Sequence, residues 1–233
     1  MRRAERGLGR LARDAGVLVL TGVLCYTAAS AAALPTPTLF RLTISGTATA
    51  DFDRTAAPET SGDCQTSERS EGVRTVSFRM RRPTVVRVVA GRVQPVAVRG
   101  IAGTVKLSGA NTVNEVCAKG EMPTSQPCAT TTRTFGDAHT TLSSAKPGSL
   151  TLRPLRVRLR RAQCPREPDE VVAAPLGPVP GPLHLSVAAL AQDRIARLAL
   201  TASATTHKNY AAPAKGMIVQ RSHWTLTFER IRP

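Results

Sequence analysis

The chain contains few aromatic and few acidic residues. Phe, Trp and Tyr make up 3% of its 233 residues, which argues against a surface on which nucleic-acid bases or sugar rings stack. The 16 Asp and Glu residues are outnumbered by 32 Lys and Arg residues, and the formal net charge is +16. Such an excess favours association with anions, although it does not by itself define a ligand.

The sequence also lacks the short motifs of common enzyme classes. Gly-x-Ser-x-Gly, His-Glu-x-x-His, a P-loop and a helix-opening Gly-x-Gly-x-x-Gly are all absent. Asp137 and His139 would share one face of a strand, with Ser143 four residues further on, but a catalytic triad needs convergence in three dimensions. We therefore predict a non-enzymatic protein without catalytic residues or a cofactor. A secreted hydrolase with an unrecognised active site is the alternative.

Metal ligands are equally sparse. The cysteines form no Cys-x-x-Cys motif, and no histidine stands at ligand spacing from them. Asp51 and Asp53 place two carboxylates on one face of a strand, but a calcium ion needs about six oxygen ligands. We predict no metal site and interpret this pair as a polar strand end.

A long apolar run occurs once, from Ala15 to Ala33. It follows a basic start that contains Arg2, Arg3, Arg6, Arg10 and Arg13. A basic start, an apolar middle and small residues at the end predict a signal peptide over residues 1–33, cleaved after Ala33 or Ala31. The run approaches the length of about 20 residues that spans a bilayer, so an uncleaved membrane anchor is the alternative. In either case the remainder is expected in the cell envelope or outside the cell.

Four cysteines follow the predicted signal peptide: Cys64, Cys117, Cys128 and Cys164. An even number in an exported protein favours two disulfides, with four free thiols as the alternative. Three pairings are possible. Cys117 and Cys128 flank a polar, proline-containing stretch, so a local Cys117–Cys128 bond is the simplest choice, and Cys64 would then pair with Cys164.

Alternation of apolar and polar residues is the most abundant pattern in the chain. In residues 39–53, Phe40, Leu42 and Ile44 begin an apolar face that continues to Phe52, with a bend expected at Gly46. Similar runs occur at 74–80, 84–89, 96–98, 101–109, 155–161 and 223–231, the last with Trp224 on its apolar face. Short alternating runs separated by Gly, Pro and Asn predict an all-β fold, an antiparallel β-sandwich or barrel-like domain.

One stretch, residues 184–206, mixes helical and strand spacing. We predict a short helix near 186–192, capped by Ser186, and then a strand over 195–205; a single longer helix is the alternative. No domain boundary is evident, so residues 34–233 are expected to form one domain with long loops at 54–72 and 165–182.

Four segments together suggest a resemblance. They are FRLTISGTATADFD after the signal, the loop cysteine in SGDC, the basic LRVRLRRAQCP and the terminal WTLTFERIRP. In this pattern the chain resembles uncharacterised secreted β-rich proteins of high-GC actinobacteria. The resemblance covers most of the mature chain and implies an exported β domain. It supplies no activity and no catalytic residues.

Arginines concentrate in two regions. The first contains Arg79, Arg81, Arg82, Arg87, Arg92 and Arg99, and the second runs from Arg153 to Arg166. Alternate arginines on a strand line one side of a sheet, so the candidate anion-binding residues are Arg153, Arg156, Arg158, Arg160 and Arg161. The expected partners are anionic envelope polymers such as wall phosphates, acidic glycans and phospholipid head groups, without specific nucleic-acid recognition. The alternative is an arginine-rich exterior that serves solubility alone.

Overall fold

The computed structural model describes residues 37–118, 120–153, 157, 159–186, 189–190 and 196–232. The chain divides after Leu34, and all of these residues belong to the unit Pro35–Pro233. The predicted signal peptide, residues 1–33, lies outside the described residues, and so does the alternative of an anchor. None of the helical residues that the structure describes belongs to a helix with the length and apolar character needed to span a bilayer.

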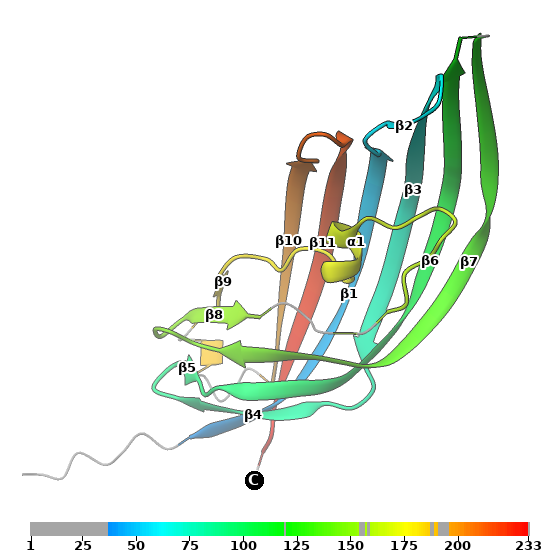
Figure 1. The fold of residues 1–233 in the computed structure, drawn as a ribbon. Helices are drawn as coiled ribbons and strands as arrows, with labels where there is room; N and C mark the ends of the chain where they lie inside the picture. Colours follow the sequence, from blue (N-terminus) through cyan, green and yellow to red (C-terminus); the bar gives the residue numbers. More distant parts are fainter. Residues whose placement is uncertain are drawn as a thin grey trace, which may run out of the picture. The chain divides into compact units, whose positions relative to one another are not determined.

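The described part of the chain consists mainly of antiparallel strands, which confirms the prediction of an all-β fold. Eleven strands join in one curved sheet (Figure 1). The elements are β1 (Thr38–Thr55), β2 (Glu59–Ser61), β3 (Cys64–Met80), β4 (Thr84–Val89), β5 (Arg92–Val93), β6 (Val96–Cys117), β7 (Gly120–Ser143), β8 (Ser149–Leu152), α1 (Asp169–Ala173), β9 (Leu183–His184), β10 (Arg197–Asn209) and β11 (Lys215–Arg230).

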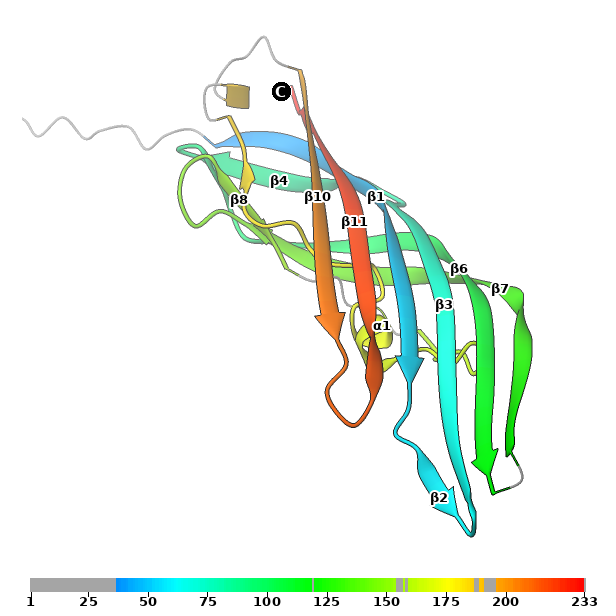
Figure 2. The same ribbon diagram turned by 90° about the horizontal axis from the view of Figure 1, so that it is seen from above.

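The main path through the sheet runs β10-β11-β1-β3-β6-β7-β8-β9. Strand β1 is central: β11 pairs with it along almost its whole length on one side. On the other side β4 pairs with its first residues and β3 with the rest. The first and last long strands of the described chain are therefore neighbours, as Figure 2 shows from above.

The apolar side chains that alternate along the strands form the inner face of the sheet. Phe40, Leu42 and Ile44 of β1 are buried, as predicted, and so is Trp224 of β11. They belong to a large core cluster at one end of the sheet. A smaller cluster at the other end contains Phe52 and four further buried residues, Ala50, Leu107, Val171 and Ile218. Apolar burial on this one face is what holds the strands in register.

A row of alternating aromatic residues and glycines crosses the sheet at the predicted bend. The register places Trp224, Gly46, Phe78, Gly103 and Phe135 side by side on five neighbouring strands. A Cβ atom at Gly46 would lie 2.6 Å from the Phe78 ring, and one at Gly103 would lie 2.5 Å from the Phe135 ring. Each ring therefore occupies the space that a side chain on the neighbouring strand would need.

The inner face is covered in part by residues 159–182, which we call the strap. The strap runs across the sheet and carries the short helix α1 (Figure 1). Val171 of α1 packs on Phe52, Leu107 and Ile218 of three different strands. The strap includes the loop predicted at 165–182, which makes a helical turn at α1 but no strand.

The structure corrects one loop prediction and one strand prediction. Residues 54–72 were expected as a loop, yet β2 and the first half of β3 form a hairpin there. The polar residues of this hairpin lack the apolar alternation that would mark a strand. Conversely, the described residues of 155–161 lie outside any strand, although Val157 and Leu159 do pack on the core.

The stretch 184–206 follows the predicted order in its described part. The strand predicted at 195–205 is β10. Most of the helix predicted at 186–192 lies outside the described residues. At its start, the backbone N–H of Ala189 donates a hydrogen bond of 3.1 Å to the side-chain oxygen of Ser186, as expected for a helix cap.

Candidate anion-binding site

A hollow of about 710 Å³ opens over the aromatic–glycine row. Its lining includes side chains that face away from the core, because odd-numbered residues of β1 and β3 point outward. Two arginines line it, together with five hydroxyl-bearing residues, and no acidic residue does so. The polar members are Arg79, Arg81, Ser45, Thr47, Ser77, Thr104 and Thr134.

The two arginines of this hollow have no acidic partner in the part of the chain that the structure describes. Arg79 is the last residue of β3 that points outward, and the guanidinium of Arg81 lies over Gly136 of β7. Five more exposed arginines without an ion pair to a described residue lie on β1, β4, β5 and β6 and in the turn after β3. They are Arg41, Arg82, Arg87, Arg92 and Arg99. We call these seven residues the arginine cluster.

The acidic residues of β1 and β3 lie toward the opposite ends of these strands, where arginines form ion pairs with them. The Arg221 side chain donates a 2.6 Å hydrogen bond to Asp51. Arg69 donates two hydrogen bonds to Asp53, of 2.9 and 2.7 Å, and lies 3.0 Å from Glu71. The hydrogen bond from Arg69 lowers the pKa of Asp53 below its usual value, against a smaller opposing effect of burial. Along β1 and β3, paired charges thus lie at one end and cations without an ion pair to a described residue at the other. On the neighbouring strands, Glu229 of β11 stands opposite Arg41, and the exposed Asp137 follows Gly136 of β7.

Unpaired guanidinium groups next to hydroxyl groups are suited to binding oxyanions. A guanidinium presents planar N–H donors that match two oxygens of a phosphate, sulfate or carboxylate. Neighbouring Ser and Thr hydroxyls can donate further hydrogen bonds to such a group. The hollow is open to solvent, so any attraction there weakens as salt is added.

Of the arginines predicted as the anion site, the three that the structure describes lie outside any strand. Arg156 and Arg158 lie outside the described residues. Arg153 and Arg160 are exposed, and Arg161 is exposed and forms an ion pair with Asp169 of α1. The described residues of 155–161 therefore form no strand, and the predicted row of arginines stays a prediction for Arg156 and Arg158. The first arginine region, over residues 79–99, includes most of the cluster.

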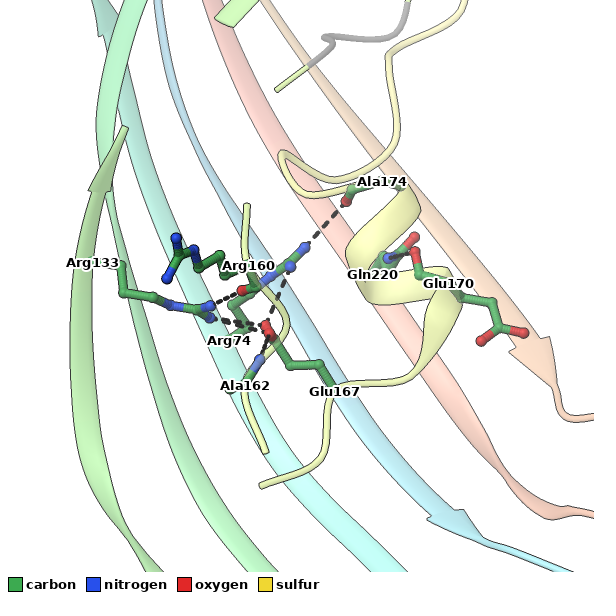
Figure 3. A network of polar contacts seen from close by, with 8 residues as sticks. All are labelled: Arg74, Arg133, Arg160, Ala162, Glu167, Glu170, Ala174 and Gln220. Atoms are coloured by element: carbon green, nitrogen blue, oxygen red, sulfur yellow. Dashed lines mark hydrogen bonds and ion pairs between the residues drawn. The ribbon is translucent and has the colours of Figure 1, made fainter. Parts of the chain in front are cut away.

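Beneath the strap lies a buried ionic network, shown in Figure 3. Glu167 accepts hydrogen bonds from Arg133 at 3.1 and 3.2 Å and from the backbone N–H of Ala162 at 2.7 Å. Arg74 of β3 lies 3.5 Å from the same carboxylate and donates to the carbonyl oxygen of Ala174 at 3.2 Å. The side chains of Arg74 and Glu167 are each 2% exposed.

This network fastens the strap to the sheet. Burial lowers the pKa of Arg74 to about 10, while the attraction of Glu167 opposes that shift. Arg74 stays protonated at neutral pH, so its charge requires the Glu167 carboxylate. The sequence offered no signal for this pair, because the two residues are 93 positions apart.

The four cysteines that the structure describes form two disulfides, but the predicted pairing is wrong. The bonds are Cys64–Cys117 and Cys128–Cys164, with Cα atoms 4.1 and 5.3 Å apart. Residues 120–128 are part of β7 and not a loop, so Cys128 lies opposite Gly109, eight positions along β6 from Cys117. The β3–β6 register instead places Cys64 directly opposite Cys117. The second disulfide ties the strap to β7.

The other residues considered as chemical groups do not assemble into a site. The four histidines lie on four different strands, and all are exposed: His139, His184, His207 and His223. No hydrogen bond links Asp137, His139 and Ser143 among the described residues. The two sulfurs nearest to Glu115 are joined to each other in the Cys64–Cys117 disulfide, so they are not metal ligands. Asp51 and Asp53 are paired with arginines, as described above.

Comparison with known proteins gives no match to this chain among protein-family models, curated proteins or solved structures.

Proposed function

We propose that this protein is an exported, non-enzymatic β domain of the cell envelope or the extracellular space that binds anionic polymers through its arginine cluster. The observation that carries the proposal is the hollow beside Arg79 and Arg81. It combines two guanidinium groups that form no ion pair with a described residue and five hydroxyl-bearing residues, and no acidic residue lines it. The proposal differs from the sequence-based one in placing the binding residues on β1 and β3–β6, and no longer at 153–161.

Export is supported by the two disulfides. Disulfides persist in oxidising compartments and are rare in the cytosol, where thiols are kept reduced. Together with the basic and apolar character of residues 1–33, they favour an extracytoplasmic location. The proposal includes the resemblance of the chain to secreted β-rich proteins of actinobacteria, which also implies an exported β domain.

Binding is tested with the purified protein and immobilised polyphosphate, polygalacturonate and neutral dextran over a series of salt concentrations. We expect binding to the two anionic polymers, loss of that binding as salt rises, and no binding to dextran. The double variant Arg79→Gln, Arg81→Gln should weaken binding roughly tenfold, since two exposed charge contacts together contribute about 1–2 kcal/mol.

The matched control is Arg69→Gln, Arg221→Gln, which removes the same charge from arginines that are already paired with acids. Its affinity should stay close to that of the unchanged protein. An equal loss in both double variants would mean that net charge alone acts, and binding that ignores salt would remove the electrostatic explanation.

Export is tested by mass spectrometry of the protein recovered from the culture medium and from the membrane fraction. We expect the mature chain to begin just after Ala33 or Ala31. Retention of residues 1–33 on protein in the membrane fraction would indicate an anchored envelope domain. Retention of these residues on cytosolic protein with reduced cysteines would contradict the proposal.

A further inference from the structure

Strand β10 forms one edge of the sheet. Figures 1 and 2 show it at the margin of the row of long strands. It pairs with β11 over all 13 of its residues, and no other described strand pairs with it. An unpaired strand of this length presents a row of backbone hydrogen-bonding groups to any second strand that can reach it.

The positions of these backbone groups follow from the register. At the two ends of the β10–β11 ladder, the carbonyl of Ala196 accepts from the N–H of Arg230, and the N–H of Tyr210 donates to the carbonyl of Gly216. Hydrogen-bonded pairs alternate along an antiparallel ladder, so the even-numbered residues of β10 bond to β11. The odd-numbered residues from Arg197 to Asn209 therefore direct their N–H and C=O groups away from the sheet.

The opposite edge of the long strands is protected. The free edge of β7 carries Pro123 and Pro127, which have no N–H to donate. The Cys128–Cys164 disulfide also ties the strap to this strand. Strand β10 contains no proline, and the small residues Thr201, Ala202, Ser203, Ala204 and Thr205 form its centre.

The charges on β10 are neutralised within the chain. Arg197 lies 3.9 Å from Glu229, and the ammonium of Lys208 lies 2.9 Å from Glu170. The arginine cluster lies on β1 and β3–β6, away from this edge. Despite the overall positive charge, two copies of β10 can thus approach each other without bringing unpaired cations together.

We propose that β10 is the interface of a two-fold symmetric dimer, in which β10 of a second copy adds antiparallel to it. With Ser203 on the symmetry axis, all 13 residues of each strand overlap. Each odd-numbered residue, whose backbone N–H and C=O groups point away from β11, then stands opposite an odd-numbered residue of the other copy. Arg197 then meets Asn209 and Lys208 meets Leu198, so no like charges stand opposite each other. The inference does not depend on the proposed binding of anions.

The experiment is sedimentation of the purified protein from micromolar to millimolar concentrations, at physiological and at high salt. We expect the unchanged protein to form a concentration-dependent dimer. Because Ser203 would face its own copy, Ser203→Lys and Ser203→Asp should each be monomeric, and an equimolar mixture of the two should dimerise again. The control Thr75→Lys adds the charge of Ser203→Lys on the same face of β3, an interior strand of the sheet, and should leave the dimer intact.

Hydrogen exchange of the unchanged protein gives a second readout that needs no variant. The amides of Thr201, Ser203 and Thr205 should become protected as concentration rises, while the exchange of Ser77 on β3 stays constant. A monomer at every concentration would overturn the proposal. So would a dimer that both Ser203 variants form unaltered, or one whose formation leaves the β10 amides unprotected.

Discussion

Glu167 joins three partners that come from different parts of the chain. Its carboxylate contacts Arg74 of β3, Arg133 of β7 and the backbone of the strap itself. A buried ion pair is weak support for stability as a whole, because desolvation of both charges offsets their attraction. Removing one partner is different, because it leaves the other charge buried and uncompensated.

We therefore expect Glu167→Gln to lower the free energy of unfolding by about 3 kcal/mol, as measured by urea titration. Adding Arg74→Met to this variant should recover much of the loss, since no buried cation then remains at that position. The control is Glu170→Gln, which breaks the ion pair with Lys208 at the surface, where the lysine is 60% exposed. It should cost less than about 1 kcal/mol. Equal effects of Glu167→Gln and Glu170→Gln would show that the buried network does not hold the strap.

At the scale of the strands, the aromatic–glycine row shows why these glycines are required. Gly103 adopts a backbone conformation outside the left-handed region, so its role is one of space and not of backbone freedom. A Cβ atom there would lie 2.2 Å from the carbonyl oxygen of Ser77 in addition to its contact with the Phe135 ring. The strands can approach each other only because no side chain stands at that position.

Gly103→Ala should accordingly destabilise the protein by about 1–3 kcal/mol through overpacking, as measured by thermal or urea unfolding. Gly181→Ala in the strap is the matched control, because a Cβ at Gly181 would meet no atom within 4 Å. That variant should change stability by less than about 0.5 kcal/mol. A Gly103→Ala protein as stable as the control would mean that the Phe135 ring and the β3 backbone shift at little cost.

The strands that alternation predicts are those with one buried face. β1, β4 and β11 were predicted because apolar residues occupy every second position, and the same holds for the second half of β3. The first half of β3 was missed because its residues extend beyond the core and carry polar side chains on both faces. Residues 155–161 show the opposite error. Val157 and Leu159 pack on the core although neither belongs to a strand, so for these two residues the pattern records burial without strand pairing.

At the scale of the whole molecule, the contacts that could not be predicted are those that depend on register between distant segments. The disulfide pairing follows from which residues of β3 and β6 stand opposite each other, and no local spacing reveals it. The same is true of the arginine cluster. Its first arginines were evident in the sequence, but only the alignment of β1 with β3 places the Ser45 hydroxyl opposite Arg79.

The pairing of β1 with β11 has a consequence for how the polypeptide reaches this fold. Phe40 stands opposite Arg230, so the central strand lacks its partner on that side until about 190 further residues have been synthesised. Val171 of the strap likewise packs against Ile218 of β11, and the smaller core stays incomplete until then. A half-synthesised or half-translocated chain would thus expose the edge of β1 that β11 covers in the folded protein. We infer that the sheet is completed only when synthesis is nearly finished and β11 can pair with β1.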